Sequence, residues 1–325
     1  MEEQSVEPAS RKPFSFAWPQ KVDLGGKIVL AFGGGGNLGE TFAYAAAACG
    51  AIPVLSDAVP SDPEGRRSAL AKLAAIVGNV KAVNPAAPSA WYAGEIASLT
   101  DVAAIVERAK RHFGRIDVVV NFAGVSHEPF DLFKDDPAKM VATFRRVSET
   151  NLTGAFIVTA CAARVMIPQR FGQIIHLCSS GSRVSLYGAY AYNATKHGVE
   201  GLIKTAAAQL APFNVRVNGV APGTVETDLN RGLLKEADGR YKPRAMSILA
   251  HTPSKRFATR EGVAESIIAL CLDQRHLTGN ICFADDGYVV EGHSWPEGNR
   301  ALYAGSAELE ALYRRLDEEY PPERT

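Results

Sequence analysis

Three side chains in the middle of the sequence have the chemistry to move a proton on or off an alcohol. Tyr192 lies four residues before Lys196, and Ser179 lies thirteen residues before Tyr192. Side chains at i and i+4 share one face of a helix, which predicts that the phenol and the ammonium are neighbours. A free phenol ionises near pKa ~10, and a nearby positive charge favours its phenolate. With a serine hydroxyl to hold a carbonyl oxygen, the set suits acid–base catalysis. Taken alone, the pair is also compatible with a surface contact that arose by chance.

A glycine-rich turn near the start of the chain is typical of a dinucleotide site. Residues 33–39 read Gly-Gly-Gly-Gly-Asn-Leu-Gly, between an apolar run at 28–32 and an alanine-rich segment at 40–49. Glycines let the turn close and let backbone N–H groups approach a pyrophosphate at the positive end of a helix. This strand–turn–helix context is the one that the dinucleotide fingerprint requires.

The side chain that follows the second expected strand bears on the choice of cofactor. Asp57 lies eighteen residues beyond Gly39. A carboxylate there can accept hydrogen bonds from ribose hydroxyls and would repel a 2′-phosphate. The sequence therefore favours NAD over NADP, although Arg66 and Arg67 lie near enough in sequence to leave NADP open.

Composition narrows the class of protein. The 325 residues carry 35 Lys+Arg and 35 Asp+Glu, so a formal net charge of zero argues against nucleic acid or an acidic membrane as a partner. Hydrophobic residues make up 46% of the chain, enough for a sizeable core, and no run approaches the roughly 20 apolar residues of a membrane span. The five cysteines show no Cys-x-x-Cys pair and the histidines no ligand spacing, which predicts reduced thiols, a cytoplasmic protein and no metal site.

Strand and helix signals alternate along most of the chain. We expect strands at 28–32, 52–56, 91–93, 116–121, 173–178, 215–220 and 280–284, and helices at 40–49, 61–77, 101–113, 137–165, 189–210 and 259–273. Repeated alternation predicts an α/β fold, a Rossmann-type doubly wound parallel sheet in a single domain over 25–290. Residues 1–24 are expected to be an N-terminal arm, and 291–325 a C-terminal extension with an amphipathic helix at 306–320.

Several further motifs occur in the order of a known family. Asn121-Phe122-Ala123-Gly124, Asn151-Leu152-Thr153-Gly154 and the run 217–223 (Val-Asn-Gly-Val-Ala-Pro-Gly) accompany the glycine turn and the Tyr-x-x-x-Lys pair. From about 24 to 288 the chain resembles a short-chain dehydrogenase/reductase. One departure concerns the turn: Asn37 stands where the family has its middle glycine, and asparagine tolerates the left-handed conformation expected there.

The resemblance implies a role for each matching position. Tyr192 would be the general acid–base, Lys196 would bind the nicotinamide ribose, Ser179 would position the substrate oxygen, and Asn151 would hold a water on a kinked helix. The implied cofactor-binding residues are Gly33, Gly36, Asn37, Leu38, Gly39, Asp57, Glu95, Ile96, Asn121, Ala123, Gly124, Tyr192, Lys196, Pro222, Gly223, Val225 and Thr227.

The segment 227–257 is expected to be the substrate loop. Its sequence looks like the D-mannonate oxidoreductase (fructuronate reductase) branch, which implies a sugar acid or polyol as the substrate. A sugar acid needs a cation for its carboxylate, and Arg231, His251 and Arg183 are the candidates, each of which is also compatible with a solvated loop position. The many charges of the loop argue against a lipid pocket, unless they all face solvent.

Two other functions stay open. One is a dehydrogenase of a hydrophobic alcohol or steroid, and the other is a non-catalytic NAD-binding sensor on the same fold. Enzymes of this resemblance are usually homodimers or homotetramers joined through their long helices, which here would span 137–165 and 190–210. We therefore expect a small-molecule substrate and a homo-oligomer, with no nucleic-acid or membrane partner.

Overall fold

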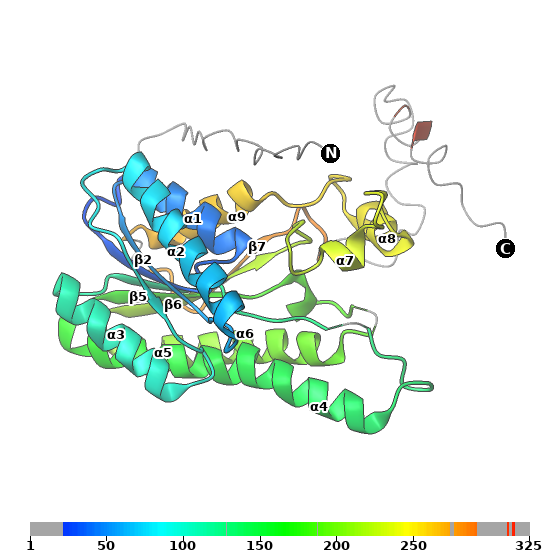
Figure 1. The fold of residues 1–325 in the computed structure, drawn as a ribbon, viewed down its shortest axis with the longest axis horizontal. Helices are drawn as coiled ribbons and strands as arrows, with labels where there is room; N and C mark the ends of the chain where they lie inside the picture. The colour runs from blue at the N-terminus through cyan, green and yellow to red at the C-terminus, as the bar shows by residue number, and fades with distance from the viewer. Residues whose placement is uncertain are drawn as a thin grey trace, which may run out of the picture.

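The protein folds around one seven-stranded parallel sheet (Figure 1). The computed structural model describes residues 22–127, 129–186, 188–273 and 276–290, together with Ala311, Arg314 and Arg315. The strand order is β3-β2-β1-β4-β5-β6-β7, so the chain starts in the middle and winds outward in both directions. The strands are β1 (Ile28–Phe32), β2 (Ile52–Asp57), β3 (Ala90–Ala93), β4 (Val118–Asn121), β5 (Gly172–Leu177), β6 (Val215–Pro222) and β7 (Ile281–Ala284). The predicted Rossmann-type α/β fold is confirmed.

Helices cover both faces of the sheet (Figure 1). One face carries α1 (Asn37–Ala48), α2 (Pro63–Val83) and α9 (Arg260–Cys271), and the other carries α3 (Leu99–Phe113), α4 (Pro137–Ser148), α5 (Gly154–Gln169) and α6 (Tyr190–Leu210). Two short helices, α7 (Arg231–Leu234) and α8 (Pro243–His251), lie together beyond the carboxyl ends of the strands. The sequence did not predict these two, because neither is long enough to show a clear apolar period.

The strands are buried because both of their faces are covered. Every residue of β1, β4 and β6 is buried, as expected for parallel strands between two helical layers. Pro53 is tolerated in β2 because pairing with β3 begins only at Val54, so the missing N–H faces no partner strand. Pro53 is the second residue of β2, an early position in the strand.

The helix predicted at 137–165 is interrupted rather than continuous. Residues Glu149–Thr153 form a π-helical turn, η1, between α4 and α5, and Asn151 lies inside it. An extra residue in such a turn re-aims the side chains around it, which is why π turns occur at functional sites. Over Pro137–Gln169 the helix is long and apolar enough to cross a bilayer, contrary to the expectation from sequence, but 56% of its most apolar window is buried within the fold.

The ends of the domain are only partly described. Leu24, which the sequence assigns to the N-terminal arm, is fully buried, and its N–H donates to the Cys49 carbonyl at 2.7 Å. Most of the N-terminal arm, residues 1–21, and the amphipathic pattern expected at 306–320 lie outside the described residues, apart from Ala311, Arg314 and Arg315.

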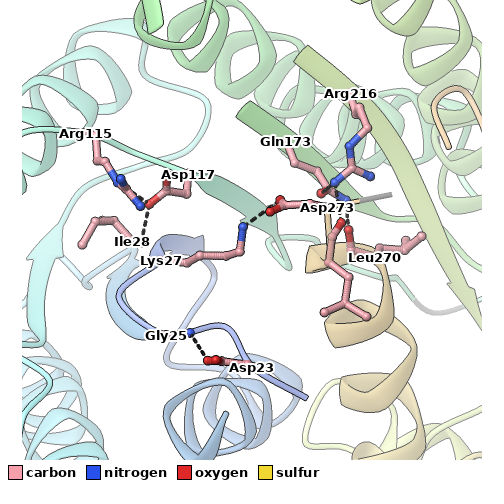
Figure 2. A network of polar contacts seen from close by, with 11 residues as sticks. Asp23, Gly25, Lys27, Ile28, Arg115, Asp117, Gln173, Arg216, Leu270 and Asp273 are labelled. Carbon is pink, nitrogen blue, oxygen red and sulfur yellow. Dashed lines mark hydrogen bonds and ion pairs between the residues drawn. The ribbon is translucent and has the colours of Figure 1, made fainter. Parts of the chain in front are cut away.

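A polar network joins the elements at the amino ends of the strands (Figure 2). The Asp117 carboxylate accepts the Ile28 N–H at 2.7 Å and the Arg115 Nε–H at 2.9 Å. Lys27 pairs with Asp273 at 2.8 Å. The groups at this end of the sheet therefore bind one another and tie β1, β4 and the end of α9 together.

Candidate active site

A cavity of about 430 Å³ opens at the carboxyl ends of the strands. Its walls come from the glycine turn after β1, the segments that follow β4, β5 and β6, the first turns of α6, and the loop that carries α7 and α8. In a parallel sheet these ends meet at one edge, at the point where the strand order reverses, which is where ligands bind in open α/β folds.

The three side chains with acid–base chemistry line this one cavity. Tyr192 and Lys196 lie one turn apart on α6, and the Lys196 Nζ is 5.6 Å from the centre of the Tyr192 ring. Lys196 is almost fully buried and donates a hydrogen bond to the Leu177 carbonyl at 2.7 Å. Ser179 directly follows the end of β5, and its Oγ accepts the Gly181 N–H at 3.1 Å. Side chains from two separate segments, α6 and the end of β5, are thus brought together as the sequence predicted.

Asn151 lies behind the cavity wall rather than in it. Its Oδ1 accepts the Val125 N–H at 2.8 Å, and its Nδ2 donates to the Val125 carbonyl at 3.0 Å. The same Nδ2 lies 3.3 Å from the Thr195 Oγ1, next to Lys196. The carboxamide therefore holds the segment after β4 and the start of α6 in place.

A buried histidine supports the floor of the site. His176 on β5 is fully buried, with Nε2 at 2.9 Å from the Thr159 Oγ1 and Nδ1 at 3.3 Å from the Asn121 Nδ2. Burial, helped by the charge of Lys196, lowers the pKa of His176 to about 3. The imidazole is therefore neutral at physiological pH. The sequence signal for this histidine was only its place in an apolar strand.

The glycine turn has the shape of a phosphate cradle. A Cβ on Gly33, whose φ is +73°, would lie 2.6 Å from the Ala123 nitrogen, and one on Gly39 would lie 2.6 Å from the Gly33 carbonyl oxygen. Gly36 is the N-cap of α1 and has no side chain to cap the helix, which leaves the first backbone N–H groups of the helix to a ligand. These residues fit a dinucleotide pyrophosphate.

Asn37 does not take the conformation that the sequence suggested. It is the first residue of α1 and has no positive φ. Its Oδ1 instead accepts the Asp228 N–H at 2.8 Å, so it joins the glycine turn to the substrate loop 191 positions away. The side chain that replaces the family's glycine therefore links the two halves of the cavity.

The predicted cofactor residues divide into two groups. Those that line the cavity are Gly33, Gly36, Asn37, Leu38, Gly124, Tyr192, Lys196, Pro222, Gly223, Val225 and Thr227. Those that do not line it are Gly39, Asp57, Glu95, Ile96, Asn121 and Ala123. Residues of the second group hold the segments around the cavity in place: the Asn121 Oδ1 accepts the Ala123 N–H at 3.0 Å, and the Asp57 carboxylate accepts the Gly35 N–H of the glycine turn at 2.8 Å.

Asp57 lies directly behind the glycine turn. Its carboxylate accepts the N–H groups of Gly35 and Ala58, both at 2.8 Å. Burial raises the pKa of Asp57, while these two hydrogen bonds and the charge of Lys72 oppose the rise. Lys72, on α2, lines the cavity at this end, and the sequence had not singled it out.

The three residues predicted to bind a substrate carboxylate do not reach the cavity. Arg231 pairs with Asp228 at 3.5 Å on the exposed side of the loop. Arg183 pairs with the buried Glu200 at 3.2 Å, and the exposed His251 contacts the Ser247 carbonyl at 2.7 Å. Arg231 and His251 bind acceptors in their own loop and Arg183 binds one on α6, so each takes a structural role instead.

The substrate loop lines the cavity with four apolar and four polar or charged side chains. The apolar ones are Leu229, Leu233, Leu234 and Ile248, and Leu186, from the segment before α6, lines the same cavity. The loop also contributes Arg244, which lies one helical turn before Ile248 on α8. Sequence reasoning missed Arg244 because the i, i+4 relation to Ile248 becomes visible only once 243–251 is known to be a helix.

Comparison with known proteins identifies the family. The family model described as "Enoyl-(Acyl carrier protein) reductase" matches residues 37–289, most of the chain. The chain belongs to the short-chain dehydrogenase/reductase family. It is 30% identical to the uncharacterised oxidoreductase YxjF of Bacillus subtilis, over 82% of this chain and 99% of that protein. It is also 30% identical to (+)-borneol dehydrogenase 2 of Salvia officinalis, over 85% of this chain and 94% of that protein.

The fold is also similar to that of solved reductase structures. Levodione reductase superposes with a TM-score of 0.72 at 26% identity, over 82% of this chain and 98% of that one. As a short-chain dehydrogenase/reductase, the protein is an oxidoreductase that acts on alcohol or ketone groups with a nicotinamide cofactor. The relatives do not single out the D-mannonate branch that the substrate loop suggested.

Proposed function

We propose that the protein interconverts a secondary alcohol and a ketone, with Tyr192 as the acid–base group and NAD as the cofactor. The observation that carries the proposal is the meeting of Tyr192, Lys196 and Ser179 with the glycine turn in a single cavity. Oxidation of a secondary alcohol moves a proton from its oxygen and a hydride from its carbon. This cavity holds side chains that can transfer the proton, and beside them a turn that can bind the nicotinamide cofactor that carries the hydride.

The chain's own residues would handle the proton. When bound, NAD accepts or supplies the hydride. During reduction, the Tyr192 hydroxyl donates its proton to the carbonyl oxygen, and during oxidation the phenolate takes it back. The Ser179 hydroxyl donates a hydrogen bond to the same oxygen and orients it. The buried ammonium of Lys196, 5.6 Å from the phenol ring, stabilises the negative charge that develops there.

The preference for NAD over NADP rests on Asp57. Its half-buried carboxylate would meet the adenosine ribose and repel a 2′-phosphate. Lys72 opposes this preference, because its positive charge lines the same end of the cavity. We expect kcat/KM to be higher with NAD⁺ than with NADP⁺, and Asp57→Ser to narrow the ratio. A wild-type preference for NADP⁺ would mean that Lys72 decides the choice.

The cavity favours a substrate with an apolar body. Four apolar side chains of the substrate loop, Leu229, Leu233, Leu234 and Ile248, line it, whereas charged Arg231, Lys235 and Arg240 pair with acids of their own loop. Asp228 and Arg244 are the charged side chains of the loop that line the cavity. Its four apolar side chains still fit the hydrophobic alcohol that the sequence left open. A sugar acid of the D-mannonate type is the second candidate, and the observation in its favour is the presence of Arg244 in the wall.

A substrate panel separates these candidates. The purified protein would be given NAD⁺ with alicyclic and terpenoid alcohols, hydroxy acids, polyols and D-mannonate, and NADH with the matching ketones, while absorbance of NADH is followed. We expect turnover of alcohols with an apolar ring or chain and little turnover of polyols. Tight NADH binding without turnover of any compound would support a sensor instead of an enzyme.

We also propose that the protein is a cytoplasmic homodimer or homotetramer. Val141 and Phe144 on α4 and Phe156 on α5 are large apolar side chains that are 50%, 41% and 59% exposed on the outer helical layer. A second copy would bury them. Light scattering is expected to give a multiple of the 34.8 kDa chain mass, and Phe156→Glu is expected to lower the measured mass.

The proposed cytoplasmic location rests on the cysteines. The free thiols of Cys49, Cys161, Cys178, Cys271 and Cys282 suit a reducing compartment.

A further inference from the structure

One charged group in the cavity wall has no task in the mechanism above. Two lysines and one arginine line the cavity: Lys72, Lys196 and Arg244. Lys196 is held by the Leu177 carbonyl, and Lys72 acts on Asp57 at the glycine-turn end. Arg244 is half-buried, and within the described part of the chain no hydrogen bond or ion pair engages its guanidinium. A cation therefore faces the open space of the cavity.

Three acids around the substrate loop are bound to other cations. Glu226 pairs with Lys235 at 2.8 Å, Asp228 with Arg231 at 3.5 Å, and Asp286 with Arg256 at 3.1 Å. The Asp285 carboxylate accepts the N–H groups of Gly287 and Val289 instead. None of these carboxylates neutralises Arg244, so its charge is available to a ligand.

The position of Arg244 in the fold assigns it to the substrate end of the cavity. It lies in the first turn of α8, which packs against α7 beyond the carboxyl ends of the strands (Figure 1). Ile248 lies one helical turn after it on the same helix, and the apolar Leu233 and Leu234 of α7 line the same cavity. Its charge also acts on the half-buried phenol of Tyr288, where it lowers a pKa that burial raises.

A half-buried guanidinium beside apolar side chains loses part of its hydration, and it regains that energy best from an anion that matches its planar fork. We propose that Arg244 binds a carboxylate at one end of the substrate, so that the substrate is a hydroxy acid or oxo acid with an apolar middle. The inference rests on the proposed function, because it names the class of substrate for the same cavity. The carboxylate binds at Arg244, the apolar part lies against the leucines of the loop, and the carbinol or carbonyl lies at Tyr192.

Kinetics with matched substrates test the proposal. Oxo acids of increasing chain length, beginning with levulinate, would be compared with their methyl esters in NADH oxidation. We expect the wild type to prefer the best acid over its ester about tenfold or more in kcat/KM, the effect of one charge-assisted hydrogen bond. Arg244→Gln should lose this preference mainly through KM for the acid, while the ester changes less than about threefold.

Two further variants test whether the preference for the acid depends on the guanidinium of Arg244. Arg244→Lys keeps the charge but not the fork, and it should retain part of the preference for the acid. Arg240→Gln is the matched control, because Arg240 pairs with Asp238 at 2.7 Å on the same loop and does not line the cavity. It should leave both substrates unchanged.

Binding gives a readout that does not depend on turnover. Titration calorimetry on the full-length enzyme–NADH complex would compare octanoate with octanamide. The wild type should bind octanoate about tenfold more tightly, and Arg244→Gln should bind the two equally. NADH affinity, measured by its fluorescence, should be the same in both proteins.

The outcomes distinguish this inference from the proposed function. An acid preference that survives in Arg244→Gln, or an equal affinity of the wild type for octanoate and octanamide, overturns the role of Arg244. A loss of NADH affinity in Arg244→Gln as large as the loss for the acid would place the guanidinium on the cofactor and also overturns it. If octanoate binds through Arg244 but no ketone is reduced, the proposed function fails and the anion site stands.

Discussion

At the amino ends of the strands the buried polar groups bind one another, whereas at the carboxyl ends several of them face an open cavity. In the first region Asp117 holds Ile28 and Arg115, and Arg216 contacts Gln173 and donates to the Leu272 carbonyl at 2.7 Å (Figure 2). In the second region Tyr192 and Arg244 line about 430 Å³ of space. Paired groups contribute to stability, and groups left without a protein partner are available to a ligand, so changes at the two ends should affect different measurements.

The largest expected effect is at the cavity. Tyr192→Phe removes only the hydroxyl, so the packing of α6 is kept while the proton donor is lost. We expect kcat to fall by about 10³-fold, within the range for a positioned acid–base group. Thermal unfolding and NADH titration should match the wild type. Near-full activity of this variant would show that another group moves the proton.

The next effect is at the opposite end of the sheet. Asp117→Ala leaves the Ile28 N–H without its acceptor in a buried position and breaks the contact with Arg115. Hydrogen bonds to a buried charge predict a loss of about 3 kcal/mol in the free energy of unfolding, measured with urea. The kcat of the folded fraction should be unchanged. Asp238→Ala, at an exposed acid, is the control and should unfold like the wild type.

The buried imidazole of His176 should make the free energy of unfolding depend on pH. The pKa of its imidazole is about 3 in the folded protein, compared with 6.5 for an unperturbed histidine, the value expected in the unfolded chain. Below pH 6.5 the imidazole therefore binds a proton in the unfolded chain but stays neutral in the folded protein. The free energy of unfolding consequently falls as the pH is lowered. We expect a loss of about 2 kcal/mol between pH 7 and pH 5 from this group.

His176→Gln tests that expectation, since glutamine can bond to Thr159 or Asn121 but does not titrate. Its free energy of unfolding, compared with that of the wild type at both pH values, should show a flatter dependence on pH. An identical dependence in the two proteins would mean that other groups control the response to acid.

The smallest effect concerns the link between the two sides of the cavity. Asn37→Gly restores the glycine typical of the family and removes the hydrogen bond to Asp228. One neutral hydrogen bond is worth about 1 kcal/mol, so KM for the substrate should rise roughly fivefold. The dissociation constant for NADH, measured by fluorescence, should change little. A loss confined to NADH would instead assign Asn37 to the cofactor alone.

Sequence reasoning succeeded where the signal is local or repeated. The strand periodicity, the glycine turn at 33–39 and the i, i+4 pair Tyr192/Lys196 each depend on neighbours along the chain. Strand and helix bounds shifted by a few residues at most for β1, α3 and β7. It failed in the substrate loop, where Arg231 and Arg244 look alike in sequence but one pairs with Asp228 and the other faces the cavity.

The sequence by itself determined the parallel α/β sheet, the nicotinamide chemistry and the residues with acid–base character, because these follow from periodicity and from motifs whose parts are close together in the chain. Only the tertiary structure decided which cation of the loop lies in the wall, that Asn37 reaches Asp228, and that His176 is held neutral. The physical reason is that pairing and burial depend on contacts between distant segments. The sequence gives the charge of each side chain, but the fold determines whether another group in the protein already pairs with that charge.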